Sequence, residues 1–107
     1  MPLNYTEAAP TRDELNTHAE PIIVQFGANW CGHCQGAQAL IDEALAKHPE
    51  LKPIMVEDGR GRPLGRGFQV KLWPTLVFLK GGQEIARIVR PGSASEVRDA
   101  IAKLLNL

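Results

Sequence analysis

The sequence lacks the features that would tie the protein to a membrane, a nucleic acid or a metal ion. None of its apolar runs approaches the roughly 20 residues that a helix needs to span a bilayer. Twelve basic and twelve acidic residues give a formal net charge of zero, so no overall field draws the chain to nucleic acid or to an anionic membrane surface. Only two cysteines are present, and no second cluster of Cys or His completes a four-ligand zinc site. We therefore expect no metal, no nucleic-acid partner and no membrane association.

The N-terminus is equally poor in targeting signals. Its first twelve residues contain two prolines and several polar side chains but no long apolar core, which argues against a signal peptide or a membrane anchor. The expected location is the cytosol, although a periplasmic chain trimmed of its signal would look the same. No internal repeat or low-complexity segment is present, so residues 1–107 are expected to form a single domain that acts as a monomer.

The segment from Pro21 to Cys34 is the best-defined part of the sequence. It begins with a β-branched apolar run, typical of a strand buried on both faces. The run breaks at Gly27 and leads to Trp30-Cys31-Gly32-His33-Cys34. After Cys34 the apolar residues recur at three and four positions, the pattern of a helix with one buried face that ends at His48. Both cysteines are therefore expected where a strand becomes a helix.

This position suits disulfide exchange. The unpaired N–H groups and the dipole at a helix N-terminus favour a thiolate over a thiol, and Cys31 lies nearer that end. Cysteines three residues apart also lie on one side of a helix, so their sulfurs can approach bonding distance. We expect Cys31 to be the nucleophile and Cys34 to be the resolving cysteine that breaks the mixed disulfide. A structural disulfide or half of a zinc site is the alternative.

His33 is a third candidate catalytic residue, because it lies beside the thiolate expected at Cys31. A protonated imidazole would stabilise that thiolate, favour the reduced protein and make its disulfide a stronger oxidant. The alternative is that His33 is only an exposed spacer between the two cysteines.

The rest of the chain alternates between strand and helix patterns. Before the cysteines we expect a short edge strand at Leu3 to Thr6, a helix from the capping box of Thr11 and Glu14 to about His18, and the strand before Gly27. The helix after Cys34 is followed by a buried strand at Pro53 to Val56 and by an irregular loop with at most a short helix at Gly59 to Gly67. The last part is expected to hold a buried strand at Leu76 to Leu79, a turn at Lys80 to Gly82, an edge strand at Glu84 to Val89, and a terminal helix after a capping box at Ser93 and Glu96.

The segment Trp30-Cys31-Gly32-His33-Cys34, with Trp73-Pro74-Thr75 after it, resembles the thioredoxin superfamily. Its Cys-Gly-His-Cys motif is similar to the active site of protein disulfide isomerase domains. The resemblance covers nearly the whole chain. It implies the thioredoxin fold, an α/β architecture whose central mixed sheet of four to five strands is flanked by three to four helices.

The resemblance also implies how a substrate would bind. Pro74 would be cis and would face the disulfide, and Trp73 would offer its backbone N–H and C=O to an extended peptide. Trp30 and Trp73 would form an apolar rim, and Gly32 would complete the substrate-binding residues. A trans proline that merely opens a strand, and a core role for either tryptophan, are the alternatives.

Four positions depart from the family's pattern. Gln25 stands where thioredoxins carry a buried Asp, Met55 where they carry a lysine, Gly27 where they carry a bulky aromatic residue, and Ala39 where the helix often kinks at proline. A neutral amide cannot accept the proton of Cys34, so we expect Glu57 or water to take the place of the missing base. These changes argue against an ordinary thioredoxin that turns over with thioredoxin reductase.

The sequence thus predicts a protein disulfide oxidoreductase that acts in cell redox homeostasis through a redox-active Cys31–Cys34 pair, with no metal or organic cofactor. Protein thiols and disulfides would be its substrates, with an unknown reductase or oxidase as partner. The alternative is an interaction or chaperone-like module of the same fold, whose Cys pair regulates binding. The arginines of the glycine-rich loop could recognise an anionic partner or simply be solvated: Arg60, Arg62 and Arg66.

Overall fold

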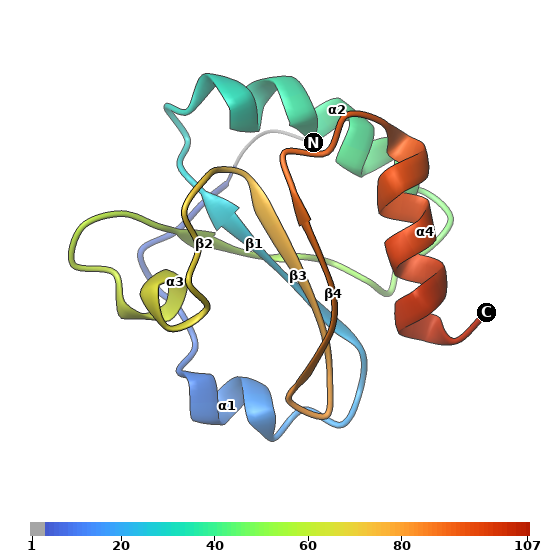
Figure 1. The fold of residues 1–107 in the computed structure, drawn as a ribbon, viewed down its shortest axis with the longest axis horizontal. Helices are drawn as coiled ribbons and strands as arrows, with labels where there is room; N and C mark the ends of the chain where they lie inside the picture. The colour runs from blue at the N-terminus through green and yellow to red at the C-terminus, as the bar shows by residue number, and fades with distance from the viewer. Residues whose placement is uncertain (1–3) are drawn as a thin grey trace.

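The computed structural model describes residues 4–107 and places one β-sheet between two layers of helices (Figure 1). The sheet has the strand order β2-β1-β3-β4. Its strands are β1 (Ile22–Gly27), β2 (Ile54–Glu57), β3 (Thr75–Lys80) and β4 (Gln83–Val89). β1 and β2 are parallel, whereas β3 is antiparallel to β1 and β4. The predicted mixed sheet, with the strand after Gly82 at its edge, is confirmed.

Helices cover both faces of the sheet because side chains alternate along each strand. α2 (Gly32–Leu45) and α4 (Ala94–Leu105) lie on one face, and α1 (Arg12–Asn16) and α3 (Pro63–Gly67) lie toward the other (Figure 1). On β1, Ile23 belongs to the apolar cluster under α2 and α4, whereas Val24 and Phe26 belong to the cluster under α1 and α3. Gln25 follows the alternation and lies on the α2 side, where it meets Gln38.

Side-chain caps begin two of the helices as the sequence predicts. Thr11 accepts a hydrogen bond from the backbone of Glu14, whose carboxylate accepts one from the Thr11 backbone. Ser93 accepts from the backbone of Glu96 at the start of α4, but the carboxylate of Glu96 accepts from Gly92 instead of Ser93. The hairpin between β3 and β4 turns at Gly81 and Gly82, which both have positive φ, a region that glycine enters without steric cost.

The N-terminal edge strand is wrong in extent. Leu3 lies outside the described residues, and Thr6 forms one isolated parallel bridge with Val56 of β2. The chain leaves the sheet after this single bridge, and the hydroxyl of Thr6 donates to the carbonyl of Ala8 at 3.0 Å. Two predicted helices are also shorter than expected: α1 ends at Asn16 and α2 ends at Leu45.

Candidate active site

The two cysteines lie where β1 gives way to α2. The chain leaves the sheet at Gly27 and enters the helix at Gly32, with Cys31 as the N-cap residue. The Sγ atom of Cys31 accepts a hydrogen bond from the backbone N–H of Cys34 at 3.3 Å. The sulfur therefore occupies the place of an ordinary capping oxygen and meets a donor that suits a thiolate better than a thiol. The predicted position at a strand-to-helix junction is confirmed.

The two sulfurs differ in their access to solvent. Both cysteines are free thiols in this structure. Cys31 is 7% exposed, whereas Cys34 is 0% exposed beneath it. A partner molecule that approaches the helix end therefore meets the sulfur of Cys31 first.

Gly32 and His33 lie on the outer side of the site. Both are exposed on the first turn of α2. They line an open hollow whose other wall is formed by Arg90 and Pro91, after β4. Gly32, which follows Cys31 in the sequence, is the lining residue nearest to the cysteine pair along the chain.

Trp30 and Trp73 pack against each other next to the cysteine pair. Trp30 is 74% exposed, which excludes a core role for it, and its ring meets the half-buried ring of Trp73 edge to face, with the centroids 5.5 Å apart. The indole of Trp73 donates to the carboxylate of Asp58 at 2.8 Å. The peptide bond between Trp73 and Pro74 is cis. Trp73 also packs partly against the cluster that contains both cysteines.

Arg90 is a neighbour of the site that the sequence did not indicate. Its Nε donates to the carbonyl of Trp73 at 2.9 Å, and its backbone N–H donates to the carbonyl of Pro74. Arg90 holds a φ of 51°, a left-handed conformation uncommon for a residue with a side chain. No sequence signal points to this conformation, since arginine has no preference for it.

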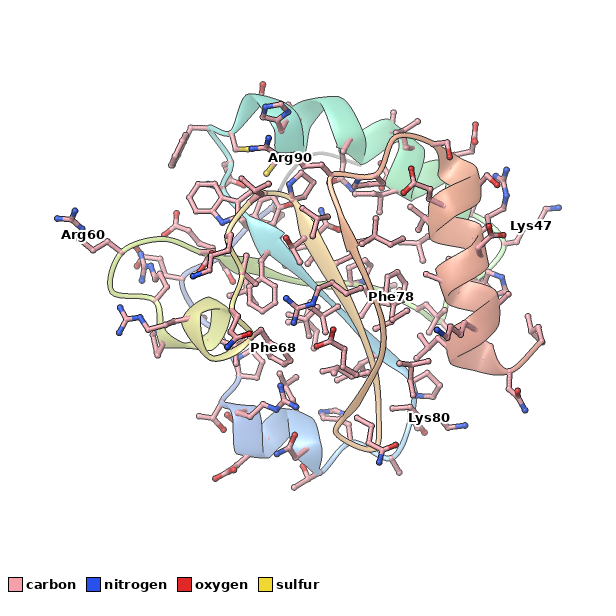
Figure 2. The ribbon with its side chains drawn as sticks, viewed as in Figure 1. Lys47, Arg60, Phe68, Phe78, Lys80 and Arg90 are labelled. Carbon is pink, nitrogen blue, oxygen red and sulfur yellow. The ribbon has the colours of Figure 1, made fainter. Side chains whose placement is uncertain are left out.

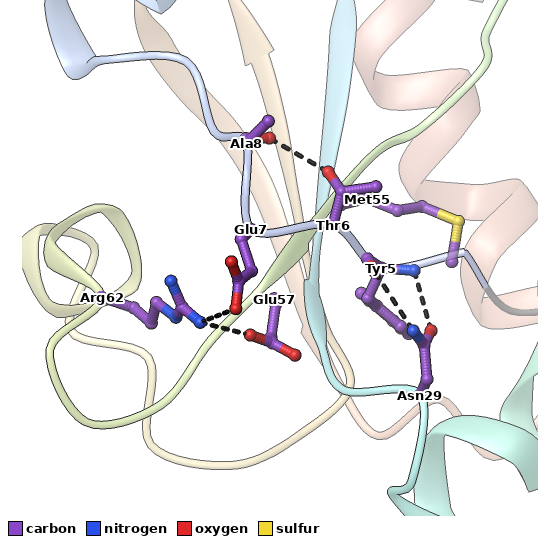
Figure 3. A network of polar contacts seen from close by, with 8 residues as sticks. All are labelled: Tyr5, Thr6, Glu7, Ala8, Asn29, Met55, Glu57 and Arg62. Atoms are coloured by element: carbon purple, nitrogen blue, oxygen red, sulfur yellow. Dashed lines mark hydrogen bonds and ion pairs between the residues drawn. The ribbon is translucent and has the colours of Figure 1, made fainter.

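Tyr5 is the second residue that sequence analysis missed. Its backbone is held by the side chain of Asn29, which accepts from the Tyr5 N–H at 2.9 Å and donates to the Tyr5 carbonyl at 3.2 Å (Figure 3). The phenol ring is buried in the cluster that contains Ala28, Cys31 and Cys34. Its hydroxyl accepts a hydrogen bond from the amide of Gln25 at 2.7 Å.

Gly27 makes the room that the Tyr5 ring occupies. A Cβ atom at Gly27 would lie 2.6 Å from Cζ of Tyr5 and 2.7 Å from Sγ of Cys34, closer than van der Waals contact allows. The missing aromatic residue at this position is thus replaced by an aromatic residue from the N-terminus. Gly27 was the one sequence signal for this arrangement, because a glycine in place of a bulky ring predicts that something else fills the space.

Burial dominates the acid–base properties of this inner region. It raises the pKa of the Cys34 thiol to about 11, and the neighbouring Cys31 adds to the rise. The hydrogen bond from Tyr5 acts in the opposite direction and favours the Cys34 thiolate. Burial also raises the pKa of Tyr5 well above that of a free phenol. The phenol is therefore a donor at neutral pH and does not act as a base.

Glu57 lies at the C-terminal end of β2, as predicted, but its carboxylate pairs with Arg62 at 2.6 Å. Arg62 also pairs with Glu7 at 2.8 Å, so this ion-pair group ties the N-terminal segment to β2 (Figure 3). Met55 packs against the cysteine cluster in place of the family's lysine. Of the three arginines in the loop, Arg62 is thus engaged within the protein, whereas Arg60 points away from it (Figure 2).

Residues 4–107 contain neither a metal-binding cluster nor a membrane-spanning helix. Within this part of the chain, no group of three or more His, Cys, Asp or Glu side chains is arranged to hold a metal ion. No helix of these residues has the length and apolar character needed to cross a bilayer.

A slightly exposed and a fully buried thiol at one helix end, with Trp73 of the cis Trp73–Pro74 bond packed against their cluster on a mixed sheet, define a disulfide-exchanging protein of the thioredoxin class. The thioredoxin family model matches residues 4–103. The structure of thioredoxin 2 from Pseudomonas aeruginosa PAO1 in its reduced form superimposes with a TM-score of 0.87 and 55% sequence identity, covering 99% of this chain and 98% of that one.

Curated relatives agree. The thioredoxin of Mycobacterium tuberculosis (strain ATCC 25618 / H37Rv) is 31% identical over 107 residues, covering 98% of this chain and 91% of that one. The bifunctional thioredoxin reductase/thioredoxin of Mycobacterium leprae is also 31% identical, but the chain spans only 23% of its length. The chain therefore belongs to the thioredoxin family, and it is a thiol–disulfide oxidoreductase with one pair of cysteines.

Proposed function

We propose that the protein exchanges disulfides with protein clients in two steps, with Cys31 as the attacking sulfur and Cys34 as the resolving sulfur. The observation that carries this order is the contrast in access: Cys31 caps the helix at the surface, whereas Cys34 lies beneath it. In the first step the Cys31 thiolate attacks a client disulfide, forms a mixed disulfide and releases one client thiolate. In the second step Cys34 attacks Cys31 Sγ and releases the other client sulfur. The thiols of Cys31 and Cys34 are oxidised to a disulfide, and one client disulfide is reduced to two thiols.

The client would bind as an extended segment beside Pro74. The backbone of Trp73 would pair with it, as in strand addition. Trp30 and Gly32 would contact the residues that flank the client's sulfur. The hydrogen bond from Arg90 to the Trp73 carbonyl supports this role, because it marks that carbonyl as an exposed acceptor next to the hollow.

His33 would favour the reduced protein by stabilising the Cys31 thiolate when it is protonated. Its exposed position on the first turn of α2 supports this role, since a positive charge there lies near the sulfur. The expected result is a disulfide that oxidises clients more readily than it would with an uncharged residue at this position.

We further propose that the protein works as a monomer in the cytosol, with no metal or organic cofactor and without binding nucleic acid or membranes. The use of cysteine supports a reducing compartment, because both cysteines belong to the exchange site and neither is left for a structural disulfide. The expectation that the four departures at Gln25, Gly27, Ala39 and Met55 set the protein apart from one that turns over with thioredoxin reductase stays a prediction. Insulin reduction coupled to NADPH oxidation by a thioredoxin reductase tests it.

Insulin reduction with dithiothreitol tests the proposed function. The wild-type protein should accelerate precipitation of the insulin B chain, and Cys31→Ser should abolish the acceleration. Cys34→Ser should instead accumulate a mixed disulfide with the client, detectable by non-reducing electrophoresis. A wild-type protein without activity that still binds clients in only one redox state would favour the interaction module instead.

A further inference from the structure

A chain of buried polar side chains connects Cys34 with the surface of α2. Gln25 donates through Nε2 to the Tyr5 hydroxyl at 2.7 Å and to Oε1 of Gln38 at 3.1 Å. Gln38 donates through its own Nε2 to the carboxylate of Asp42 at 2.9 Å. Both glutamines are buried, and Oε1 of Gln25 is a buried oxygen without a partner in residues 4–107. Apolar residues would fill this space at lower desolvation cost, so the polar chain indicates a role beyond packing.

The carboxylate of Asp42 sets which group donates and which accepts in each hydrogen bond of this series of polar side chains. A carboxylate only accepts, so Gln38 must turn its NH₂ group toward Asp42 and its oxygen toward Gln25. Gln25 must then present its NH₂ group to Gln38, and the second hydrogen of that nitrogen is donated to the Tyr5 oxygen. The Tyr5 hydroxyl has one hydrogen of its own, and Cys34 Sγ is its neighbour over Gly27, where an added Cβ would lie 2.7 Å from each of the two atoms. The hydroxyl is thereby set to donate to the sulfur.

We propose that Tyr5 is a catalytic residue of the resolving step, whose hydroxyl donates a hydrogen bond to Cys34 Sγ and stabilises the thiolate as it forms. Gln25, Gln38 and Asp42 are positioning residues that keep the hydroxyl hydrogen directed at the sulfur. This inference rests on the proposed function, since it assumes that Cys34 is the resolving cysteine. Tyr5 then does by donation what a buried carboxylate would do by accepting a proton.

The atoms of the step balance without a base at Tyr5. Cys34 loses its proton, its thiolate attacks Cys31 Sγ, and the bond between Cys31 and the client sulfur breaks. The departing client thiolate ends with one proton, equivalent to the one that Cys34 lost. Tyr5 keeps its own proton throughout, because its pKa is raised further than that of Cys34. The titratable groups that face Cys34 among the described residues are Cys31, on its own helix end, and Tyr5.

The backbone of Tyr5 is held in register with the active-site loop. The two hydrogen bonds with Asn29 attach it two residues before Cys31 (Figure 3). The amide of Thr6 donates to the Met55 carbonyl, and the amide of Glu57 donates to the Thr6 carbonyl. Movement of the helix end relative to the N-terminal segment is therefore restricted, and the hydroxyl stays at the sulfur.

Tyr5→Phe tests the proposal, since it keeps the ring that fills the space over Gly27 and removes only the hydroxyl. The reduced protein is mixed with 5,5′-dithiobis(2-nitrobenzoate), and thionitrobenzoate is followed by stopped flow. The first equivalent reports attack by Cys31, and the second reports resolution by Cys34. We expect the second phase to slow about tenfold at pH 7 and its pH midpoint to rise by about one unit, with the first phase unchanged.

Asp42→Asn provides a second test at a half-exposed position, where the fold is not at risk. An asparagine can donate to Gln38, which allows both glutamines to turn over and lets Gln25 accept the Tyr5 hydrogen. The second phase should then slow about threefold. Loss of a negative charge alone would favour the Cys34 thiolate and speed the second phase. Reorientation of the glutamines therefore predicts a slower second phase, whereas removal of the charge alone predicts a faster one. Asp99→Asn, exposed on α4, is the control for charge removal and should change neither phase.

The outcomes distinguish the role of Tyr5 from the proposed roles of Cys31 and Cys34. A second phase that is unchanged in Tyr5→Phe, or faster in Asp42→Asn, overturns the role of Tyr5 while Cys31 chemistry stands. A wild-type protein whose first equivalent does not come from Cys31, as shown by Cys31→Ser, overturns the proposed function and this inference with it. Slower second phases in both variants, with normal first phases, support the proposal.

Discussion

Cys31 and Cys34 are three residues apart in the sequence, yet different parts of the molecule surround them. The sulfur of Cys31 contacts local structure: it caps its own helix and accepts a hydrogen bond from the backbone of that helix. The sulfur of Cys34 is served by distant side chains: Tyr5 from the N-terminus, and Gln25 from β1 behind the Tyr5 hydroxyl. A short motif therefore defines the outer half of the site, around Cys31, whereas the fold as a whole defines the inner half, around Cys34.

The largest effect expected on the inner half comes from Gly27→Ala. The added Cβ would collide with the Tyr5 ring and with Cys34 Sγ, at 2.6 and 2.7 Å. Overpacking of this kind lowers the free energy of unfolding by about 3 kcal/mol. Urea unfolding of the reduced protein measures the loss. Gly36→Ala on α2 is the matched control: its Cβ meets nothing within 4 Å, so that variant should be equally or more stable than the wild type.

The pH dependence of stability gives the next largest effect. Burial raises the pKa of Cys34 to about 11, above the unfolded value near 8.5, so the folded state favours the neutral thiol. This contribution is complete below about pH 8.5 and is lost as pH rises through 11; the difference between the two pKa values amounts to about 3 kcal/mol in total. Urea unfolding of the reduced protein across this range should show the loss. Cys34→Ser should lack it, and equal losses in both proteins would contradict the assignment.

The outer half of the site is tested by His33→Pro. Without the imidazole the Cys31 thiolate loses the stabilisation that a protonated His33 would give, so the reduced protein is less favoured. The reduction potential of the pair should fall by about 30 mV, equivalent to about 1.4 kcal/mol. Equilibration with glutathione or with a reference thioredoxin measures the potential. His18→Ala, which is exposed and distant in sequence from the cysteines, is the control, and an equal shift there would remove His33 from the mechanism.

The smallest effect is expected at Arg90. A client that pairs with the Trp73 carbonyl competes for that oxygen with the hydrogen bond from the Arg90 guanidinium. Arg90→Ala should therefore lower the KM for a peptide disulfide by about threefold while kcat changes little. Steady-state kinetics with a short disulfide peptide measure both constants. A raised KM would show that the guanidinium contacts the client, and Lys103→Ala on α4 is the control for loss of a positive charge.

Local patterns explain why much of the fold could be predicted. The apolar run before Gly27 and the change of period after Cys34 placed β1 and α2, and the capping pairs at Thr11 and Ser93 placed α1 and α4. These signals act over one or two helical turns, and no distant residue is needed to interpret them. The ends of the strands and helices were predicted less accurately, because Thr6 and the last turn of α2 depend on tertiary contacts.

The inner half of the site could not be predicted in the same way. Tyr5 reaches Cys34 through pairing of the N-terminal segment with β2 and through the hydrogen bonds of Asn29, none of which has a local sequence signature. The substitution of Gln25 for an acid led us to look for a replacement base. The structure places the Tyr5 hydroxyl beside Cys34 instead, and it pairs Glu57 with Arg62.

The central claim is that the two sulfurs have unequal roles, and direct alkylation tests it. Fully reduced protein is treated briefly with substoichiometric iodoacetamide at neutral pH, and the modified peptides are resolved by mass spectrometry. The account predicts that Cys31 carries the label at least about tenfold more often than Cys34, because one sulfur caps the helix at the surface and the other is buried. Equal labelling of the two cysteines, or preferential labelling of Cys34, would contradict it.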